Sequence, residues 1–433
     1  MDNPRKLAHL SLIKWDTQEC FSNIEINTVL SRSRLEKSDA SLYTLLYLGV
    51  IEKKLFLDSV TDQYSKIPSA ELDTETKNAL RLGFYQLIFT DRIPDYSAVD
   101  ESVNLAPKKS KGLVNAVLRS FLRAKKSISY PCDKWERLSQ EYSFPHELVD
   151  LLRKSYGDDV AEKMIAYTER DKSLSVRVNT IKTSAEKVAQ ELVSRGYEPS
   201  LSKFADDVIK CALPISEIKD LIDTGAVFIQ DEASRICSQA INAQSGEKIM
   251  DACACPGGKT FSMAIDMDNR GEINAFDLHR NKLALIEKGA KKLGIDIVSV
   301  DEQNAKIYVQ EYDSQYDRVL CDVPCSGLGV IYKKPEIKYK SIEAIRALPL
   351  VQYEILSNCS KYVRVGGVLV YSTCTTCSQE NEKNVTRFLE ENPSFEPVEF
   401  SFGDLNSHNG MYTFFPHITG TDGFFVAKLK RIK

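Results

Sequence analysis

Hydrophobic residues in the first third of the chain recur three and four positions apart, which is the spacing of one face of an α-helix. The segments 38–60 and 75–93 both follow this period, and no alternating strand pattern interrupts them. A further helical pair is joined by the basic turn PKKSK. The pattern therefore predicts an all-helical (all-α) domain over residues 1–130, followed by a helical connector over residues 131–172.

The hydrophobic period changes at Ser173, where an alternating segment predicts the first β-strand. A helix ending at Gly196 and two further short strands follow, so residues 173–235 are expected to form a small α/β unit. From Gly246 onward, short apolar strands alternate with amphipathic helices. Such alternation is typical of a doubly wound parallel sheet, and it predicts a Rossmann-like α/β domain over residues 236–433. The expected fold class is therefore multi-domain.

The composition is that of a globular protein, with 43% hydrophobic and 27% charged residues in a chain of 433. The net charge of −4 does not by itself indicate a nucleic-acid partner, but residues 1–130 carry 19 Lys and Arg against 16 Asp and Glu. Within them lies a stretch without any acid, here called the basic stripe. It consists of Lys108, Lys109, Lys111, Arg119, Arg123, Lys125 and Lys126. The basic stripe is a candidate phosphate contact, although a solvated helix face would show the same pattern.

The N-terminal segment lacks the apolar stretch of roughly 7–15 residues that a signal peptide carries. No run of apolar residues approaches the ~18 that indicate a membrane-spanning helix. The 11 cysteines are therefore expected to be reduced thiols, and their odd number agrees with that. These features predict a soluble, cytoplasmic protein without membrane contact.

A glycine-rich turn follows the first strand of the C-terminal domain and reads DACACPGGKT, residues 251–260. Gly257 and Gly258 let the backbone approach a ligand closely, and they open a helix whose N-terminal amides face that ligand. Such a turn can serve a dinucleotide, a nucleoside triphosphate or S-adenosylmethionine. Because both the P-loop spacing and the G-x-G-x-x-G spacing are missing, the first two cofactors are disfavoured.

Two polar residues follow the next strands of the same sheet. Asp277 ends the second strand, about 20 residues beyond the turn, where an acid typically accepts hydrogen bonds from ribose hydroxyls. Asn304 follows the third strand, where a side chain that contacts adenine would lie. An exposed strand-end acid and a solvated loop amide are the structural alternatives for these two positions.

Two cysteines follow the fourth and fifth strands of the predicted sheet. The fourth strand runs through Asp322 to Cys325, and the fifth runs into Cys374. Consecutive strands on this side of a doubly wound sheet are neighbours, and their carboxyl ends open into the cofactor crevice. The alternative, that each thiol is merely a small buried hydrophobe, does not explain why both stand at adjacent strand ends beside a carboxylate.

Zinc is an alternative explanation for one of these thiols, because Cys374 and Cys377 are spaced C-x-x-C. Structural zinc usually takes four Cys or His ligands. The chain has no second C-x-x-C motif and only 5 histidines, which are dispersed. A metal site is therefore not expected.

Two thiols and an acid suit one reaction in particular. Carbon 5 of cytosine is a poor nucleophile, but addition of a thiolate to carbon 6 makes it enamine-like and able to attack a methylsulfonium. An acid near ring nitrogen 3 stabilises the charge that develops there. A second thiol can assist the loss of the proton from carbon 5, after which the first thiol is released.

The motifs DACACPGGKT, DVPCSGLGV, VYSTCT with QEN, and GTDGFFVAKL resemble those of the RNA 5-methylcytosine methyltransferases. Among these, the chain resembles the small-subunit ribosomal RNA methyltransferase B family (Sun/Fmu type) over nearly its whole length. The segments RLGFYQLIFTDRIPDYSAVDESV and GLVNAVLRSFLR look like a NusB-type domain. SVRVNT and QDEAS look like the family's small RRM-like insert.

The resemblance implies specific roles for the residues singled out above. Cys374 corresponds to the nucleophile and Cys325 to the cysteine that assists release, whereas DNA 5-methylcytosine enzymes use the latter position as nucleophile. The positions matching the family's S-adenosylmethionine site are Cys253, Ala254, Cys255, Pro256, Gly257, Gly258, Lys259, Asp277, Asn304 and Asp322. The chain departs from the family in two places, where Cys255 replaces an alanine and Asn304 stands in place of the usual Asp.

The resemblance implies a 16S rRNA (cytosine-C5)-methyltransferase that uses S-adenosylmethionine. We expect it to bind ribosomal RNA through its helical domain and to act as a monomer. The target base is expected to be flipped into the crevice, at a cost of roughly a few kcal/mol. Two alternatives remain open. One is a 5-methylcytosine enzyme for tRNA or another rRNA site, and the other is a non-catalytic RNA-binding or antitermination protein.

Overall fold

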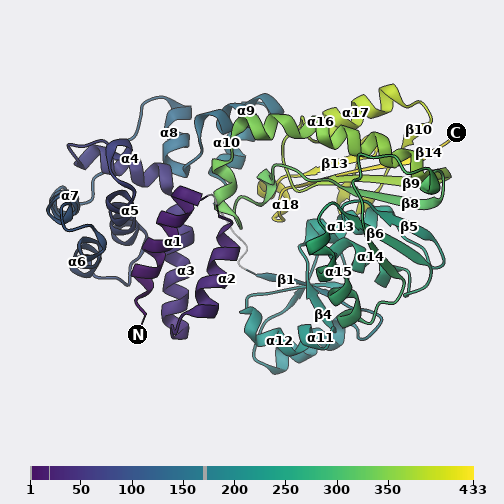
Figure 1. Ribbon diagram of the computed structural model, residues 1–433, viewed down its shortest axis with the longest axis horizontal. Helices are drawn as coiled ribbons and strands as arrows, with labels where there is room; N and C mark the ends of the chain where they lie inside the picture. The colour runs from purple at the N-terminus through teal and green to yellow at the C-terminus, as the bar shows by residue number, and fades with distance from the viewer. Residues whose placement is uncertain (1, 19, 169–172) are drawn as a thin grey trace. The chain divides into compact units, whose positions relative to one another are not determined.

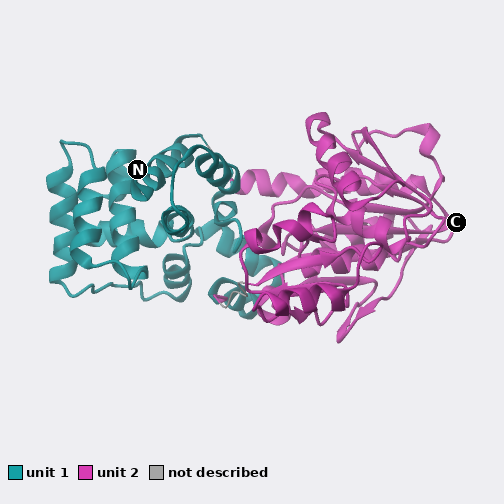
Figure 2. Ribbon diagram, turned by 90° about the horizontal axis from the view of Figure 1, so that it is seen from below, with its two compact units in different colours: residues 1–166, 331–340 teal, residues 167–330, 341–433 magenta. Residues whose placement is uncertain are grey.

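The computed structural model describes residues 2–18, 20–168 and 173–433. The chain divides into two compact units, shown in different colours in Figure 2. Unit 1 comprises Met1–Ala166 and Ile331–Lys340, and unit 2 comprises Tyr167–Val330 and Ser341–Lys433. Most of the predicted connector therefore belongs with the helical domain. Residues 331–340, which the pattern placed in the C-terminal domain, also belong to unit 1.

Unit 1 is helical throughout its described residues, in agreement with the predicted all-α fold (Figure 1). Its elements are α1 (Pro4–Gln18), α2 (Ser22–Arg32), α3 (Lys37–Glu52), α4 (Lys54–Tyr64), η1 (Ser69–Glu71), α5 (Thr74–Phe89), α6 (Asp95–Leu105), α7 (Lys111–Arg123), α8 (Lys134–Tyr142), α9 (His146–Tyr156), α10 (Asp158–Ala166) and η5 (Pro335–Tyr339). Helix α5 lies at the centre, because most of its residues are buried. The buried Arg81 on this helix pairs with Asp16 at 2.8 Å and Asp58 at 2.7 Å, so its charge is fully compensated.

The segment Ile331–Lys340 is fastened to the helices of unit 1 by specific contacts. Glu336 accepts hydrogen bonds from the backbone N–H and the hydroxyl of Ser22. The Lys338 ammonium donates to the carbonyl oxygens of Glu52 and Tyr142, at 2.7 and 3.1 Å. Tyr339 packs edge-on against Trp15 in the helical core. The chain therefore leaves unit 2 directly after the predicted site loop at Cys325, and it is anchored in unit 1 before it returns.

Unit 2 begins with a small four-stranded antiparallel sheet in the order β2-β3-β1-β4. Its elements are β1 (Leu174–Val178), α11 (Ala185–Ser194), β2 (Ser200–Leu201), β3 (Val208–Cys211), η2 (Ile215–Ile218), α12 (Lys219–Asp223) and β4 (Val227–Ile229). The apolar faces of the sheet and of helix α11 bury one another around Val176, Val188 and Ile209. This is the small α/β unit that the sequence predicted.

The main sheet of unit 2 has the order β10-β14-β9-β8-β5-β6-β7, with β13 also paired to β14. Strands β5 to β9 run parallel, and β14 runs antiparallel to β9. The elements are α13 (Glu232–Ile241), β5 (Lys248–Asp251), α14 (Gly258–Asp266), β6 (Glu272–Asp277), α15 (Arg280–Leu293), β7 (Val298–Glu302), η3 (Gln310–Tyr312), β8 (Tyr316–Asp322), η4 (Leu328–Val330), α16 (Ile342–Cys359), η6 (Ser360–Tyr362), β9 (Val363–Thr373), α17 (Glu382–Glu391), β10 (Phe395–Pro397), β11 (Ser401–Phe402), β12 (Leu405–Asn406), β13 (Met411–Phe414), α18 (Pro416–Thr419) and β14 (Phe424–Arg431).

Helices cover both faces of this sheet, as its nearly continuous apolar strands require. Leu320 of β8 and Val370 of β9 pack with helices α13, α14 and α15. The neighbouring residues Cys321 and Tyr371 point to the other face, which α16 and α17 cover. Figure 1 shows these two helical layers on either side of the strands. The Rossmann-like α/β fold predicted for this region is thus confirmed.

A buried network of charges joins the small sheet to the helices of the main sheet within unit 2. Arg235 on α13 pairs with Asp207, beside β3, and with Asp266 at the end of α14. Arg177 on β1 contacts the same two carboxylates, at 2.5 and 3.0 Å. Because removal of one partner would leave a buried charge uncompensated, the network fixes the small sheet against the cofactor-side helices. In the described ranges, no helix is both long and apolar enough to cross a membrane.

Candidate active site

The glycine turn between β5 and α14 has the backbone geometry that its sequence requires. Gly257 precedes the first residue of α14 and adopts φ +107°, in the left-handed region that favours glycine. A Cβ atom at Gly257 would lie 2.4 Å from the ring of Phe261. The turn can therefore lie against the helix only with glycine at this position, and it leads the backbone directly into a helix N-terminus.

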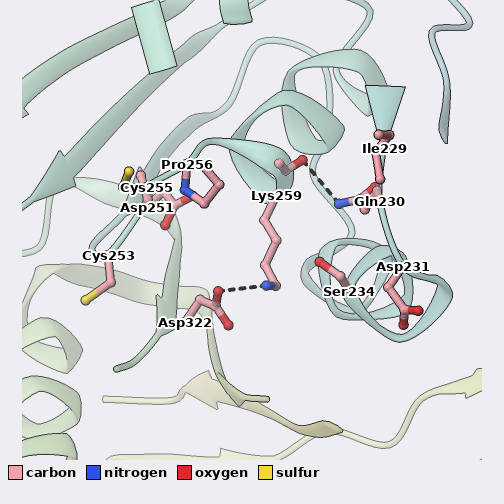
Figure 3. Close-up of a pocket in the computed structure, with 12 residues that line it drawn as sticks. Ile229, Gln230, Asp231, Ser234, Asp251, Cys253, Cys255, Pro256, Lys259 and Asp322 are labelled. Atoms are coloured by element: carbon pink, nitrogen blue, oxygen red, sulfur yellow. Dashed lines mark hydrogen bonds and ion pairs between the residues drawn. The ribbon is translucent and has the colours of Figure 1, made fainter. Parts of the chain in front are cut away.

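A cavity of about 260 Å³ lies at the carboxyl ends of β5 and β8 (Figure 3). Its lining comprises Ile229, Gln230, Asp231, Ser234, Asp251, Cys253, Ala254, Cys255, Pro256, Gly258, Lys259 and Asp322. Seven of these were predicted as cofactor-binding residues from the sequence. Gly257 and the predicted residues Asp277, Asn304, Cys325 and Cys374 do not line this cavity.

Lys259 and Asp322 form an ion pair across the cavity. The Lys259 ammonium lies 2.7 Å from Asp322, and Figure 3 shows the lysine side chain extending from α14 toward that carboxylate. The hydroxyl of Ser372 on the adjacent strand donates to the other oxygen of Asp322, at 2.7 Å. Both oxygens of Asp322 are therefore held in place, at the end of β8 that leads to Cys325.

Asp251 contributes a buried acid to the floor of the same cavity. Its Oδ2 atom accepts a hydrogen bond from the Thr260 hydroxyl at 2.7 Å. Its Oδ1 atom is buried, and no partner among the described residues donates to it. Burial raises the pKa of Asp251 to about 7. The cavity thus contains an unsatisfied acceptor whose ionised form would be stabilised by a cationic ligand.

Asp277 and Asn304 stand at the strand ends that the sequence predicted. Asp277 ends β6, and its carboxylate accepts hydrogen bonds from the backbone N–H groups of Cys255 at 3.3 Å and His279 at 2.9 Å. It therefore adjoins the glycine turn without lining the cavity. Asn304 follows β7, and its side-chain oxygen accepts from the backbone N–H of Lys306 at 3.1 Å.

The two predicted cysteines meet at the ends of β8 and β9. The Sγ atoms of Cys325 and Cys374 are 3.2 Å apart, and both side chains are partly exposed. Strand register explains the meeting, because Asp322 pairs directly with Ser372 and each cysteine follows within three residues. The prediction that these thiols lie together at the carboxyl edge of the sheet is confirmed.

The two thiols have different electrostatic surroundings. The hydrogen bond with Cys374, burial, and the nearby charges of Cys374, Glu380 and Asp322 raise the pKa of Cys325 well above its usual range. Burial lowers the pKa of Lys259, but the nearby carboxylate of Asp322 outweighs it and raises that pKa, and Cys374 is among the groups that interact with the ammonium. Cys374 therefore lies near a cation, whereas Cys325 lies near the carboxylates of Glu380 and Asp322.

One wall of the cavity was not predicted from the sequence. It is formed by Gln230, Asp231 and Ser234, where β4 leads into α13. Gln230 donates to the carbonyl of Gly258 at 3.2 Å and accepts from the hydroxyl of Ser262 at 2.7 Å, which fixes this wall to the glycine turn. The signal was present in QDEAS, where an Asp caps a following helix. In the sequence, that motif had indicated only the small α/β unit.

The two cysteines of the C-x-x-C motif have different surroundings. Cys377 is buried, and its thiol hydrogen-bonds with the Gln379 side-chain oxygen at 3.0 Å. Across the part of the chain that the structure describes, no three His, Cys, Asp or Glu side chains are grouped as a metal site would require. Cys374 instead contacts the Cys325 thiol, at 3.2 Å between the two Sγ atoms.

A mainly parallel sheet with one antiparallel strand, and a glycine turn over a cavity at its carboxyl edge, define a Rossmann-like methyltransferase. Comparison with known families identifies the particular one. The family 16S rRNA methyltransferase RsmB/F matches residues 238–430, the NusB family matches residues 2–123, and the RsmF/B-like ferredoxin-like domain matches residues 144–216. The chain belongs to this family of S-adenosylmethionine-dependent rRNA small subunit methyltransferases.

Relatives align over the full length of the chain. The probable ribosomal RNA small subunit methyltransferase B of Bacillus subtilis (strain 168) is 32% identical over 99% of this chain and 98% of its own length. The protein of the same name from Synechocystis sp. is also 32% identical, over 100% of both chains.

Solved structures share the same architecture. The crystal structure of PH0851 covers 100% of this chain and 99% of its own, with a TM-score of 0.81 and 25% identity. NSun6 from Pyrococcus horikoshii with SFG covers 67% of this chain and 99% of its own, with a TM-score of 0.59 and 25% identity. The small α/β unit and the NusB-type domain inferred from sequence motifs are thus confirmed as family domains.

Proposed function

We propose that this protein methylates carbon 5 of a cytosine in 16S ribosomal RNA, with Cys374 as the nucleophile and Cys325 as the residue that assists release. The observation that carries the proposal is the pair of thiols 3.2 Å apart, in which Cys374 lies near a cation and Cys325 lies near two acids. The relatives named as small subunit methyltransferase B support the choice of ribosomal RNA.

The residues around the cavity fit S-adenosylmethionine as cofactor. When bound, it supplies an electrophilic methyl group. The unpartnered Oδ1 of Asp251 suits a cationic amino group, and the amides after Gly257 suit the carboxylate of an amino acid. Asp277, at the end of β6, is placed to accept hydrogen bonds from ribose hydroxyls. Asn304 is assigned to the adenine end, where its amide can donate or accept.

The chain's own residues then act on the cytosine ring. The Cys374 thiolate adds to carbon 6, and carbon 5 gains the electron density needed to take the methyl group. The Lys259–Asp322 pair supplies the proton that stabilises the negative charge developing on nitrogen 3: the ammonium gives a proton to the carboxylate, which passes it to the ring. Ser372 keeps that carboxylate in place. Cys325 is within hydrogen-bond reach of Cys374. After methyl transfer, Cys325 gives its own proton to solvent and accepts the proton from carbon 5, and the electron pair left on carbon 5 expels the Cys374 thiolate from carbon 6.

The experiment that tests the proposal compares covalent protein–RNA adducts formed by three variants. Wild type, Cys374→Ala, Cys325→Ala and the double variant are incubated with labelled ribosomal RNA and cofactor, then run on a denaturing gel. Cys325→Ala can complete addition and methyl transfer but not release, so we expect it to accumulate a methylated adduct. Cys374→Ala and the double variant should give no adduct and lose more than tenfold in methylation.

Three other results of this experiment would contradict part of the proposal. An adduct from Cys374→Ala alone would reverse the two roles and match the DNA-enzyme assignment. Methylation by Cys374→Ala within tenfold of wild type would refute a nucleophilic thiol altogether. Methylated nucleosides other than 5-methylcytosine in the wild-type product would refute the choice of carbon 5.

A further inference from the structure

Glu380 is a fully buried carboxylate that lies between the two cysteine loops of unit 2. Its side chain accepts hydrogen bonds from the backbone N–H of Ser326 at 2.9 Å and from the Ser326 hydroxyl at 2.6 Å. It also accepts from the side chains of Gln352, at 2.8 Å, and Thr375, at 3.3 Å. Within the described residues no Lys, Arg or His forms an ion pair with it. The oxygens of this buried side chain are therefore satisfied by neutral hydrogen-bond donors.

The partners of Glu380 are the immediate neighbours of the two thiols in the chain. Ser326 follows Cys325, and Thr375 follows Cys374. The hydroxyls of Ser326 and Thr375 also lie 2.7 Å apart, so the two loops and the carboxylate form one closed network. The position of one thiol relative to the other therefore depends on Glu380.

Helix α16 connects the hydrogen-bond network around Glu380 to Pro324, the residue before Cys325. Gln352 on α16 donates both to Glu380 and to the carbonyl of Pro324, at 3.0 Å. Asn381 completes the other side, since its amide accepts from the hydroxyl of Thr373 and donates to the carbonyl of Thr375. Both cysteine loops are thus held on each side of the thiol.

The charged groups around Cys325 also affect its ionisation. The groups that face Cys325 are the thiol of Cys374, the carboxylates of Glu380 and Asp322, and the phenol of Tyr371, whose pKa burial raises well above its usual range. Neither carboxylate favours a second negative charge at Cys325.

Accepting the roles assigned to the thiols under the proposed function, we propose that Glu380 is a positioning residue for this reaction. It holds the two thiols in contact, and its buried charge keeps Cys325 protonated while Cys374 becomes the thiolate. Glu380 belongs to the QEN motif of the sequence, from which no role for this residue was predicted.

The test follows the alkylation of each cysteine separately in the full-length, ligand-free protein. Wild type and Glu380→Gln are treated with iodoacetamide from pH 6 to 10, and the peptides containing Cys325 and Cys374 are quantified by mass spectrometry. In wild type, Cys374 should react at lower pH than Cys325. In Glu380→Gln, the midpoint for Cys325 should fall by about one unit or more, which is about a tenfold faster reaction at a given pH below that midpoint. Glu382→Gln, two residues further along, is the matched control and should leave both profiles unchanged.

An aspartate variant separates charge from geometry. Glu380→Asp keeps the charge but shortens the side chain, so Cys325 should remain the less reactive thiol while methylation of ribosomal RNA falls at least tenfold. An unchanged Cys325 profile in Glu380→Gln would overturn the proposal. If that variant does not fold, Glu380→Asp decides: methylation within twofold of wild type, or Cys325 alkylated as fast as Cys374, would overturn it. These readouts of Cys325 do not require catalysis, so they stand apart from the adduct gel that tests the proposed function itself.

Discussion

Asp251 shows how a single residue can be destabilising in the free protein and useful in the complex. Its carboxyl group is buried with one oxygen unpaired, and burial raises its pKa from 3.8 to about 7. A group whose pKa is higher in the folded state binds its proton more tightly there than in the unfolded chain. Asp251 therefore destabilises the folded protein least at acidic pH, and the free energy of unfolding falls as the pH rises toward 7.

Replacing Asp251 tests that balance. Below about pH 4, Asp251 is protonated in both the folded and the unfolded chain, and above about pH 7 it is ionised in both. The ionised carboxylate therefore lowers the free energy of unfolding by its full amount, roughly 4 kcal/mol, only at the higher pH. Asp251→Asn keeps an oxygen that can accept from Thr260 and removes the charge. Denaturant titration of the ligand-free proteins measures the free energy of unfolding of each. The value for the variant minus the value for wild type should rise between pH 5 and pH 8. The exposed Asp296→Asn serves as control, and a difference independent of pH would contradict the assignment.

At the scale of elements, the sequence predicted the strands that lead into the two cysteines, but it did not predict a helix and a strand that pack beside them. Strands β8 and β9 were predictable because each is a short apolar run that leads into a cysteine. Helix α16 was not predicted, and Pro349 in its interior is a residue that normally ends a helix. Strand β14 was quoted as a motif without a structural role, because nothing in its own sequence reveals that it runs antiparallel beside β9.

The site was predictable to a similar extent and for similar reasons. The meeting of Cys325 and Cys374 followed from strand order alone. The cavity wall at Gln230 and the network around Glu380 depend on side chains brought together from distant segments. The motifs QDEAS and QEN contain these two residues, but only tertiary packing could reveal the contacts that the residues make.

The contact between two glycines explains the closing motif GTDGFFVAKL. Gly423, just before β14, donates its N–H to the carbonyl of Gly329 at 2.9 Å, and Gly329 donates to the carbonyl of Cys374 at 3.1 Å. A Cβ atom on Gly329 would lie 1.8 Å from the carbonyl oxygen of Gly423, which is backbone and cannot rotate away. The loop after Cys325 is therefore held against the loop of Cys374 by close backbone contact.

Gly329→Ala should separate the two thiols without affecting the cofactor cavity. Overpacking of this kind costs about 1–3 kcal/mol, so we expect methylation to fall at least tenfold. The dissociation constant for S-adenosylmethionine, measured by calorimetry, should change less than about threefold because Gly329 does not line the cavity. Gly112→Ala in α7, where an added Cβ meets nothing, is the control. Full methylation by Gly329→Ala would show that the loop tolerates displacement.

At the scale of the whole molecule, the basic stripe and the active site belong to different compact units. The stripe lies in and around α7, and six of its seven residues are exposed. Deleting the N-terminal domain is a poor test of its role, because Ile331–Lys340 packs against the deleted helices and follows the Cys325 loop directly. A truncated protein would lose this anchoring together with any RNA contact, so point substitutions are needed.

Point substitutions in the basic stripe of the full-length protein test whether the stripe binds RNA. Each phosphate contact that is lost lowers the slope of log affinity against log salt by about 0.7–0.9, since fewer counterions are released on binding. Substituting Lys108, Arg119 and Arg123 by Gln should therefore reduce the salt slope for ribosomal RNA by about 2–3. The matched control replaces three exposed basic residues of the same unit outside the stripe, Arg32, Lys37 and Lys66, and should reduce it by less than about 1. Equal slopes for the two triple variants would mean that the stripe is a solvated helix face, and that RNA is bound by another surface of the protein.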